Sequence, residues 1–389
     1  MNFDESWIAV AARVSILASM PKHAAVRFLL FLLWGAAASA ATSPAFALRV
    51  PFSVDLPAGR VTQSDLEKCD PAPAPISALP TQSRYEPNDP TKSRVNPTRS
   101  RIYDALVKPL RDFQGGIVKR TNAFVRRPKN NADSAACALA WLKAWADADA
   151  LNRLPSDQGR LNRDQALAAL AFGYLQLSNV RVEVPGLRGA ISTWLRRLAE
   201  DSRHYSDTQT GPATRYNNHR YFAALAVAAV ALVVDDKSMF DWTMDTFEEA
   251  VCSAGELGEL PLEMRRGGRS RDYQILAVGP LVMLAEIGQV NNQEPYGECN
   301  NALRRMVSFA LRSIDDPSEV SRVSGHAQLE LPDGELKGFR VAWLVPYLKR
   351  FPDPHWQRRA GEIGGLSATA FGGNLETLFG PVTKPPATE

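Results

Sequence analysis

The chain has 389 residues, of which 45% are hydrophobic and 22% are charged, as is typical of a globular protein. The formal net charge is only +3, and no run of Lys and Arg forms a basic patch, which excludes a nucleic-acid-binding protein. A mildly basic chain can still bind an acidic polymer if its arginines converge on one cleft.

Residues 1–47 are predicted to be a signal peptide. Basic residues precede an apolar stretch at residues 28–38, and Ala45-Phe46-Ala47 has the pattern of a cleavage site, with Ala40 as the alternative. The true start fits Met20 better than Met1. The apolar stretch is shorter than the roughly 20 residues of a membrane span, so no stable membrane anchor is expected. We therefore expect a periplasmic or secreted protein.

Export favours disulfide bonds for the four cysteines, Cys69, Cys137, Cys252 and Cys299. Of the three possible pairings, Cys69–Cys137 with Cys252–Cys299 is favoured, because each bond then links neighbouring segments of chain. Four buried free thiols are the alternative. A zinc site is not expected, because no CxxC pair is present.

Residues 48–98 are predicted to be a proline-rich arm. Seven prolines fall between residues 68 and 97, which excludes a regular helix or a central strand. This segment is either an extended arm lying on the body or a mobile loop.

Residues 99–365 have the pattern of helices, with apolar residues at three- and four-residue spacing. The predicted helices lie near residues 99–126, 133–153, 162–178, 187–204, 217–234, 237–254, 271–290, 298–314 and 340–350. Residues 221–234 are apolar without interruption, which indicates a helix buried on all sides, whereas 187–204 is amphipathic and belongs outside. Alternating inner and outer helices predict an all-α fold, a toroid of antiparallel helix pairs. Residues 366–389 are expected to be a flexible tail.

Several enzyme classes lack their motifs here. The sequence contains no HExxH, no GxxxxGK[ST] and no GxSxG, and its five histidines are not spaced as metal ligands. No metal or other cofactor is therefore expected. A glycoside hydrolase with two catalytic carboxylates stays open, because Asp and Glu are plentiful.

Two polar clusters are candidates for the chemistry. Residues 217–221 (NNHRY) directly precede the buried apolar helix, and polar groups there are costly to bury unless they are hydrogen-bonded. Residues 260–273 (LPLEMRRGGRSRDY) bring four arginines within seven residues of one another, which suggests an anion site. The structural alternatives are an N-cap with an interior histidine for the first cluster, and a solvated basic loop for the second.

Together with their surroundings, these clusters resemble the alginate lyase family (poly(β-D-mannuronate) lyases, polysaccharide lyase family 5). The match is carried by residues 69–73 (CDPAP), 136–150 (ACALAWLKAWADADA), 217–224 (NNHRYFAA), 260–273 and 342–347 (AWLVPY). The spacing of seven between Arg266 and Tyr273 is that of the family.

The resemblance implies an incomplete (α/α) toroid with a deep cleft, in an enzyme that needs no metal and eliminates across C4–C5 of a uronate. Asn218 and Arg266, with His219, match the group that neutralises the C5 carboxylate. Tyr273 matches the catalytic tyrosine, which acts as base and then acid when the C5 proton and O4 lie on the same face, as in mannuronate. Its pKa, ordinarily near 10, is expected to be lowered by Arg266. Where proton and leaving group lie on opposite faces, His219 is the expected base.

Further residues are expected to contact the polymer: Tyr221, Arg215, Trp141, Tyr85, Lys92 and Arg269, with Arg84 as a further candidate in the arm. Residues 81–97 are expected to form a mobile lid over the cleft, with a static arm fastened by Cys69 as the alternative. The partner is an anionic uronic-acid polysaccharide, and a monomer is expected.

The chain also departs from the family. Gln274 replaces the usual histidine after the tyrosine, and Ser270, Arg271 and Asp272 replace small apolar residues ahead of it. Val345 replaces a glutamate. These changes keep a lyase for another polyuronate such as glucuronan, or a non-catalytic polyuronate-binding protein, as alternatives.

Overall fold

The computed structural model describes residues 47–52, 59–208, 211–331 and 335–382. The chain divides into two compact units, Met1–Ala47 and Leu48–Glu389. The predicted signal peptide forms the first unit and, apart from Ala47, lies outside the described residues. The fold below is that of the second unit.

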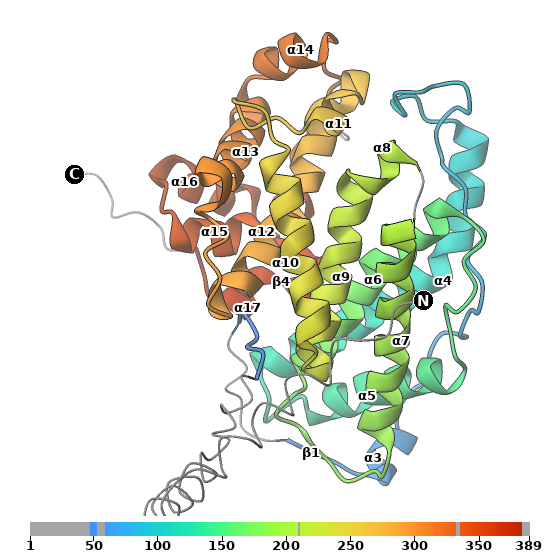
Figure 1. The fold of residues 1–389 in the computed structure, drawn as a ribbon. Coiled ribbons are helices and arrows are strands. Elements are labelled where there is room, and N and C mark those ends of the chain that lie inside the picture. The colour runs from blue at the N-terminus through green and yellow to red at the C-terminus, as the bar shows by residue number, and fades with distance from the viewer. Residues whose placement is uncertain (1–46, 53–58, 209–210, 332–334, 383–389) are drawn as a thin grey trace, which may run out of the picture. The chain divides into compact units, whose positions relative to one another are not determined.

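The second unit is all-α, as predicted (Figure 1). Its helices are α3 (Gln63–Glu67), α4 (Pro97–Arg126), α5 (Ala132–Asp147), α6 (Asp157–Leu175), α7 (Leu187–Thr208), α8 (Pro212–Arg215), α9 (Asn218–Val234), α10 (Lys237–Cys252), α11 (Pro261–Met264), α12 (Ser270–Val290), α13 (Glu298–Asp315), α14 (Ser318–Ser324), α15 (Leu344–Arg350), α16 (Pro354–Ile363) and α17 (Leu375–Phe379). Short 3-10 turns are η3 (Gly267–Arg269), η5 (Gly338–Arg340) and η6 (Thr369–Phe371).

The strands in the described part of the chain are only two residues long. β1 (Arg60–Val61) pairs in parallel with β2 (Arg181–Val182), and β3 (Ser367–Ala368) pairs antiparallel with β4 (Gly373–Asn374). Every segment predicted to be helical contains a helix, and the boundaries differ by a few residues.

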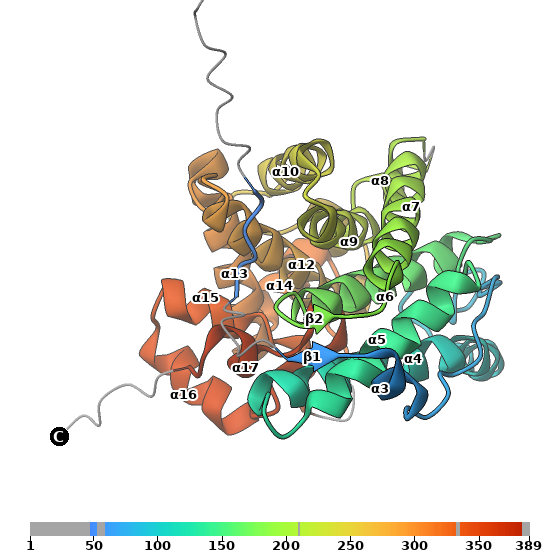
Figure 2. The same ribbon diagram turned by 90° about the horizontal axis from the view of Figure 1, so that it is seen from below.

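The helix α9 is the centre of the core. Its alanine and valine side chains are buried on every side, because it packs against α6, α7, α10 and α12. Seen from below in Figure 2, α9 lies between α10 and α6. Small side chains let these neighbours approach closely, and the long apolar run predicted this position.

Consecutive helices form the antiparallel pairs of an (α/α) toroid. Each of α4, α6, α9 and α12 packs against the helix that follows it, namely α5, α7, α10 and α13. The first members of the pairs also contact one another in the order α4, α6, α9, α12 and form an inner layer. The stretch Gly267–Val290 is long and apolar enough to cross a membrane, but 78% of its most apolar window is buried, so it is a core helix here.

Both predicted disulfide pairings are present. Cys69 is bonded to Cys137 of α5, with 5.2 Å between the Cα atoms. Cys252 at the end of α10 is bonded to Cys299 near the start of α13, with 5.3 Å between the Cα atoms. The first bond fastens the arm to the body, and the second ties two neighbouring helices together.

The part of the arm around Asp70 and Pro73, here called the lower arm, lies extended on α5. The indole N–H of Trp141 donates to the carbonyl of Asp70 at 2.8 Å, and that of Trp145 donates to the carbonyl of Pro73 at 2.8 Å. The two tryptophans therefore donate hydrogen bonds to carbonyl groups of the arm, in a stretch where the prolines prevent regular backbone hydrogen bonding. This part of the arm agrees with the alternative of a static arm fastened by Cys69.

The part of the arm around Asp89, here called the upper arm, folds around the buried carboxylate of that residue. The side chain of Asp89 accepts hydrogen bonds from the backbone N–H groups of Thr91, Ser93 and Arg94 at 2.8–3.0 Å. Although burial acts to raise it, a hydrogen bond from the Thr91 hydroxyl and these backbone hydrogen bonds hold the pKa of Asp89 well below its usual range. An antiparallel bridge joins Tyr85 to Val95 and closes the turn. Movement of this segment stays a prediction.

The tail predicted at residues 366–389 is wrong for residues 366–382. Leu366, Phe371, Leu375 and Leu378 are buried in the main core. A Cβ atom added to Gly279 of α12 would lie 2.8 Å from the ring of Phe371, so the glycine makes room for that ring. Residues 366–382 therefore belong to the body, and residues 383–389 lie outside the described part.

Candidate active site

The carboxylate of Glu263 contacts both Asn218 and Arg266, the residues predicted to neutralise the C5 carboxylate of the substrate. Glu263 lies in α11 and is fully buried. The side-chain amide of Asn218, in the first turn of α9, donates to its two oxygens at 3.0 and 3.2 Å, and the Asn218 backbone N–H donates at 2.9 Å. Nε of Arg266 lies 3.6 Å from the same carboxylate. Glu263 therefore fixes Asn218 and Arg266 relative to each other.

The same contacts also affect the pKa of Glu263. Burial raises its pKa, while the positive charge of Arg266 and the hydrogen bonds from Asn218 act to lower it. A buried carboxylate without such partners is strongly disfavoured. Asn218 and Arg266 therefore offset much of the cost of burying Glu263.

Local hydrogen bonds hold the backbone of this cluster. Asn217 is the N-cap of α9, and its side chain accepts from the N–H of His219 at 3.0 Å. The buried Gln274 accepts from the N–H of Leu260 and donates to the carbonyl of Gly258, both at 3.0 Å. The glutamine that departs from the family pattern thus supports the loop that leads into α11.

Tyr273 lies in the first turn of α12, against Arg266. The guanidinium carbon of Arg266 is 4.5 Å from the centroid of the tyrosine ring, and the Tyr273 hydroxyl donates to the Tyr85 hydroxyl at 3.1 Å. The predicted lowering of the Tyr273 pKa is wrong. Burial and the neighbouring Tyr85 raise that pKa well above its ordinary value, and Arg266 lowers it only in part. Tyr273 is therefore protonated at neutral pH.

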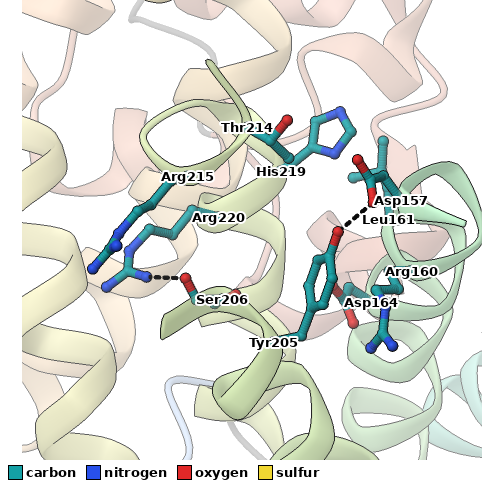
Figure 3. Close-up of a pocket in the computed structure, with 10 residues that line it drawn as sticks. All are labelled: Asp157, Arg160, Leu161, Asp164, Tyr205, Ser206, Thr214, Arg215, His219 and Arg220. Carbon is teal, nitrogen blue, oxygen red and sulfur yellow. Dashed lines mark hydrogen bonds between the residues drawn. The ribbon is translucent and has the colours of Figure 1, made fainter. Parts of the chain in front are cut away.

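His219 faces a small cavity between α6, α7, α8 and α9 (Figure 3). The cavity is lined by Asp157, Arg160, Leu161, Asp164, Tyr205, Ser206, Thr214, Arg215, His219 and Arg220. Burial and the charge of Arg266 lower the pKa of His219 to about 4, and the charge of Asp157 opposes them. The imidazole is therefore neutral at pH 7. It makes no hydrogen bond to any residue that the structure describes, so a ring nitrogen is available to accept a proton.

Tyr273 opens onto a separate cleft of about 760 Å³, a size typical of ligand sites. Four arginines and five aromatic residues line it beside Tyr273: Arg84, Arg111, Arg269, Arg340, Tyr85, Phe222, Phe339, Trp343 and Phe371. Arginines from the arm, α4, η3 and η5 thus converge on one cleft, which suits a polyanion. Aromatic rings offer flat apolar faces of the kind that pack against sugar rings.

Some of the predicted substrate-binding residues lie at these two sites. Tyr85 and Arg84 of the arm line the cleft, and Arg215 of α8 lies beside His219. Arg269 also lines the cleft, where its guanidinium donates to the Ser93 carbonyl at 3.1 Å and to the Asp272 carboxylate at 3.0 Å. Arg269 therefore fastens the arm to the start of α12.

The structure does not bring the other three to a site. Trp141 is buried under the lower arm, where it stacks against Arg120 at 3.8 Å. Tyr221 is buried in the core, and its hydroxyl donates to the carbonyl of Tyr216 at 3.1 Å. Lys92 lies in the turn around Asp89 and does not line the cleft. Burial contradicts the predictions for Trp141 and Tyr221, because a motif shared with a family does not say on which side of its element a residue lies. The substrate contact of Lys92 stays a prediction, since this residue lies in the arm.

Several residues that the structure places at the cleft or in the buried cluster behind it were missed in the sequence. Glu263 stood within the quoted motif but received no role, although a glutamate between apolar residues was a signal of a buried partner. Arg111, Phe339 and Arg340 come from segments that looked like ordinary helix surface or loop. Residues 367–371 were assigned to the tail.

Comparisons with known proteins identify the family of this chain. The family model described as "Alginate lyase" matches residues 81–320, more than half of the chain. An alginate lyase of Cobetia marina is 29% identical over 351 residues, covering 88% of this chain and 92% of the relative, and one of Azotobacter vinelandii is 27% identical over 334 residues, covering 84% and 88%. The chain belongs to the alginate lyase family.

A solved structure supports the fold. The crystal structure of alginate lyase A1-III from Sphingomonas species A1 matches with a TM-score of 0.66 at 23% identity, covering 81% of this chain and 86% of that one. At this identity the likeness shows the fold alone.

Proposed function

We propose that this chain is a polysaccharide lyase that cleaves β-1,4-linked polyuronate, preferentially mannuronate-rich alginate, by β-elimination to give 4,5-unsaturated uronate ends. The observation that carries the proposal is the cluster of Asn218, Glu263 and Arg266 directly beside Tyr273, at the edge of a cleft lined by arginines. Family membership and the names of the relatives support it.

Arg266 has the free donors that carboxylate neutralisation needs. Its Nε faces Glu263, while its terminal nitrogens make no hydrogen bond within the described part of the chain. Those nitrogens can bind the C5 carboxylate in the two-pronged geometry that guanidinium favours. Negative charge moves onto this carboxylate as the C5 proton leaves, so a donor fixed in advance stabilises the transition state most.

A protonated Tyr273 can serve as acid and base in one step when the C5 proton and O4 lie on the same face. The hydroxyl gives its proton to O4 as the C4–O4 bond breaks, and the same oxygen accepts the C5 proton. The electron pair of the C5–H bond becomes the C4=C5 double bond. Tyr273 thus ends as it began, and its raised pKa is compatible with this role.

His219 has the properties of a base for substrates in which proton and leaving group lie on opposite faces. It is neutral, and its ring has no hydrogen-bond partner among the described residues. Tyr273 is then the acid. We also propose a periplasmic or secreted monomer that binds oligouronates. A1-III complexed with a tetrasaccharide, which shares this fold with a TM-score of 0.67, supports the ligand class.

The test is a panel of mannuronan, guluronan and glucuronan, with the ultraviolet absorbance of the unsaturated product as readout. Wild-type protein should act fastest on mannuronan, with or without EDTA. Tyr273→Phe should reduce turnover to a few per cent or less, roughly the loss of a general acid–base group. The matched control Tyr221→Phe, which removes a buried hydroxyl outside the cleft, should stay within about twofold of wild type. A Tyr273→Phe variant with near wild-type turnover would remove the assigned role.

A further inference from the structure

Asp157 is an acidic residue beside the site that the proposed mechanism does not use. It lies in the first turn of α6 and lines the same small cavity as His219 (Figure 3). The hydroxyl of Tyr205 donates to Oδ1 of Asp157 at 2.5 Å, and the guanidinium of Arg160 lies 4.0 Å from the centroid of the Tyr205 ring. Two neighbouring helices therefore hold the carboxylate in one orientation.

The other charged groups facing His219 are mostly already paired. From α6, Arg160 pairs with Asp201 at 3.0 Å, and the buried Asp164 pairs with Arg163 at 3.3 Å. From α9, Arg220 lies 3.4 Å from both Asp207 and Glu249. Arg215 of α8 and Arg266 add positive charge on this side.

Asp157 differs from these groups, because it forms no ion pair with any residue in the described ranges. Its negative charge is therefore the one that is not already offset by a neighbouring cation. It acts on His219 in the opposite direction to burial and Arg266.

We propose that Asp157, oriented by Tyr205, is a positioning residue that stabilises the imidazolium formed when His219 takes a proton from the substrate. The inference rests on the proposed function and deepens it. In that step a ring nitrogen of His219 accepts the C5 proton, the C5–H electron pair becomes the C4=C5 double bond, and O4 leaves with the proton of Tyr273. A positive charge then appears on His219 beside Arg266, and the carboxylate of Asp157 compensates it.

The arrangement resembles the general logic by which a fixed carboxylate stabilises a histidine base. Its role is specific to substrates that need His219 as base, namely those with the C5 proton and O4 on opposite faces, as in guluronate. Cleavage of mannuronate, where Tyr273 handles both protons, does not form the imidazolium. The inference therefore predicts a difference between two polymers.

An ordinary structural role must be separated from this one. An acidic residue in the first turn stabilises any helix through the helix dipole, and Asp157 would do so even without His219. Asp133 is the matched case, because it is an exposed acid in the first turn of α5. Loss of this helix-dipole contribution would lower the amount of folded enzyme, and the rates on both polymers would then fall by the same factor.

The experiment measures kcat and KM of the full-length mature protein on polyguluronate and polymannuronate. Asp157→Asn should lower kcat on polyguluronate about tenfold or more, as loss of a charge that stabilises an imidazolium does, with KM changed by less than about twofold. The kcat on polymannuronate should change by less than about twofold. Asp157→Glu should restore most of the lost rate, Tyr205→Phe should give a smaller loss of the same kind, and Asp133→Asn should change neither polymer.

A second readout couples the two residues. In a His219→Gln background the effect of Asp157→Asn on polyguluronate should fall below about twofold, because residues that act through one another are not additive. Equal losses on both polymers, or full additivity with His219→Gln, would overturn the inference. So would a wild type that cleaves polymannuronate but not polyguluronate, and this result would leave the proposed function intact. A wild type that cleaves neither polymer would overturn both.

Discussion

Two buried carboxylates, Glu263 and Asp89, have opposite environments. Asp89 in the arm accepts hydrogen bonds from the Thr91 hydroxyl and from the backbone of its own turn, and these hold its pKa well below the usual range. Glu263 is bonded to Asn218 and Arg266, and burial raises its pKa. Asp89 therefore acts as a local fold element, whereas Glu263 connects distant segments that meet at the site.

The difference shows how the same group serves folding in one place and chemistry in another. Backbone N–H groups within one turn need only a few residues of sequence to converge on a carboxylate. Convergence of α9 and α11 on Glu263 requires the whole helix pairing of the body. Changes at Asp89 should therefore remain local, and changes at the Glu263 cluster should reach catalysis.

The largest effect is expected at Arg266. Arg266→Ala removes both the partner of Glu263 and the donor to the substrate carboxylate, and turnover should fall by about 10² or more, as when one charge-stabilising donor is removed. The exposed neighbour Arg265→Ala should leave turnover near wild type. Steady-state kinetics on mannuronan measures both. Similar losses in the two variants would mean that the cluster acts only through general positive charge.

A smaller effect on turnover and a clear effect on stability are expected at Glu263. Glu263→Ala leaves Arg266 and Asn218 without their buried partner, and the free energy of unfolding should drop by about 3–5 kcal/mol. Glu263→Gln keeps an acceptor for Asn218 but loses the charge, so its turnover should fall about tenfold with a smaller loss of stability. Denaturant unfolding and kinetics are the measurements, with the exposed Glu256→Gln as control. Unchanged turnover in both variants would contradict the positioning role of Glu263.

The effect at Asp89 should be confined to the arm. Asp89→Asn weakens three backbone hydrogen bonds of the turn, so the arm should become more sensitive to protease and KM should rise a few-fold, while the melting temperature changes little. Added oligouronate should protect the arm if residues 81–97 close over the cleft. Loss of the whole fold would show that the arm is part of the core rather than a lid.

The smallest effect concerns pH. The pKa of His219 is lowered to about 4, so this residue stays neutral from neutral pH down to about 5, and kcat/KM should not fall around 6.5 on its account. The folded state holds fewer protons than the unfolded state between these values, so the contribution of His219 to stability decreases as pH falls below the unfolded pKa of about 6.5. A pH series of kcat/KM, with circular dichroism at each pH, checks this. A fall in kcat/KM centred near 6.5 that His219→Gln removes would contradict the partly buried, neutral imidazole.

The fold was largely predictable, because the local sequence of a core helix shows that the helix is buried. The uninterrupted apolar run of α9 can only be buried, and the dense prolines of the arm exclude a regular long helix or a central strand there. The C-terminal segment was misassigned, because the position of Phe371 in the core depends on the space left by Gly279 of α12. Such a fit between distant residues leaves no local pattern.

The site divides in the same way. Asn218, His219, Arg266 and Tyr273 were predicted from motifs. The structure links Asn218 to Arg266 through Glu263 and Arg266 to Tyr273, and it places His219 at a separate small cavity. The Tyr273 pKa was misjudged because sequence proximity to Arg266 was visible, whereas burial by the arm and contact with Tyr85 were not. Trp141 and Tyr221 were misjudged for the same reason, since their faces are decided by packing.

The most direct test of the central claim is the chemistry of the ends that wild-type protein produces from mannuronan, read by proton nuclear magnetic resonance. Elimination by Tyr273 predicts one olefinic proton for each new reducing end. New reducing ends without the olefinic signal would indicate a hydrolase with two carboxylates, and bound but uncleaved polymer would indicate a binding protein. Either result would contradict the account.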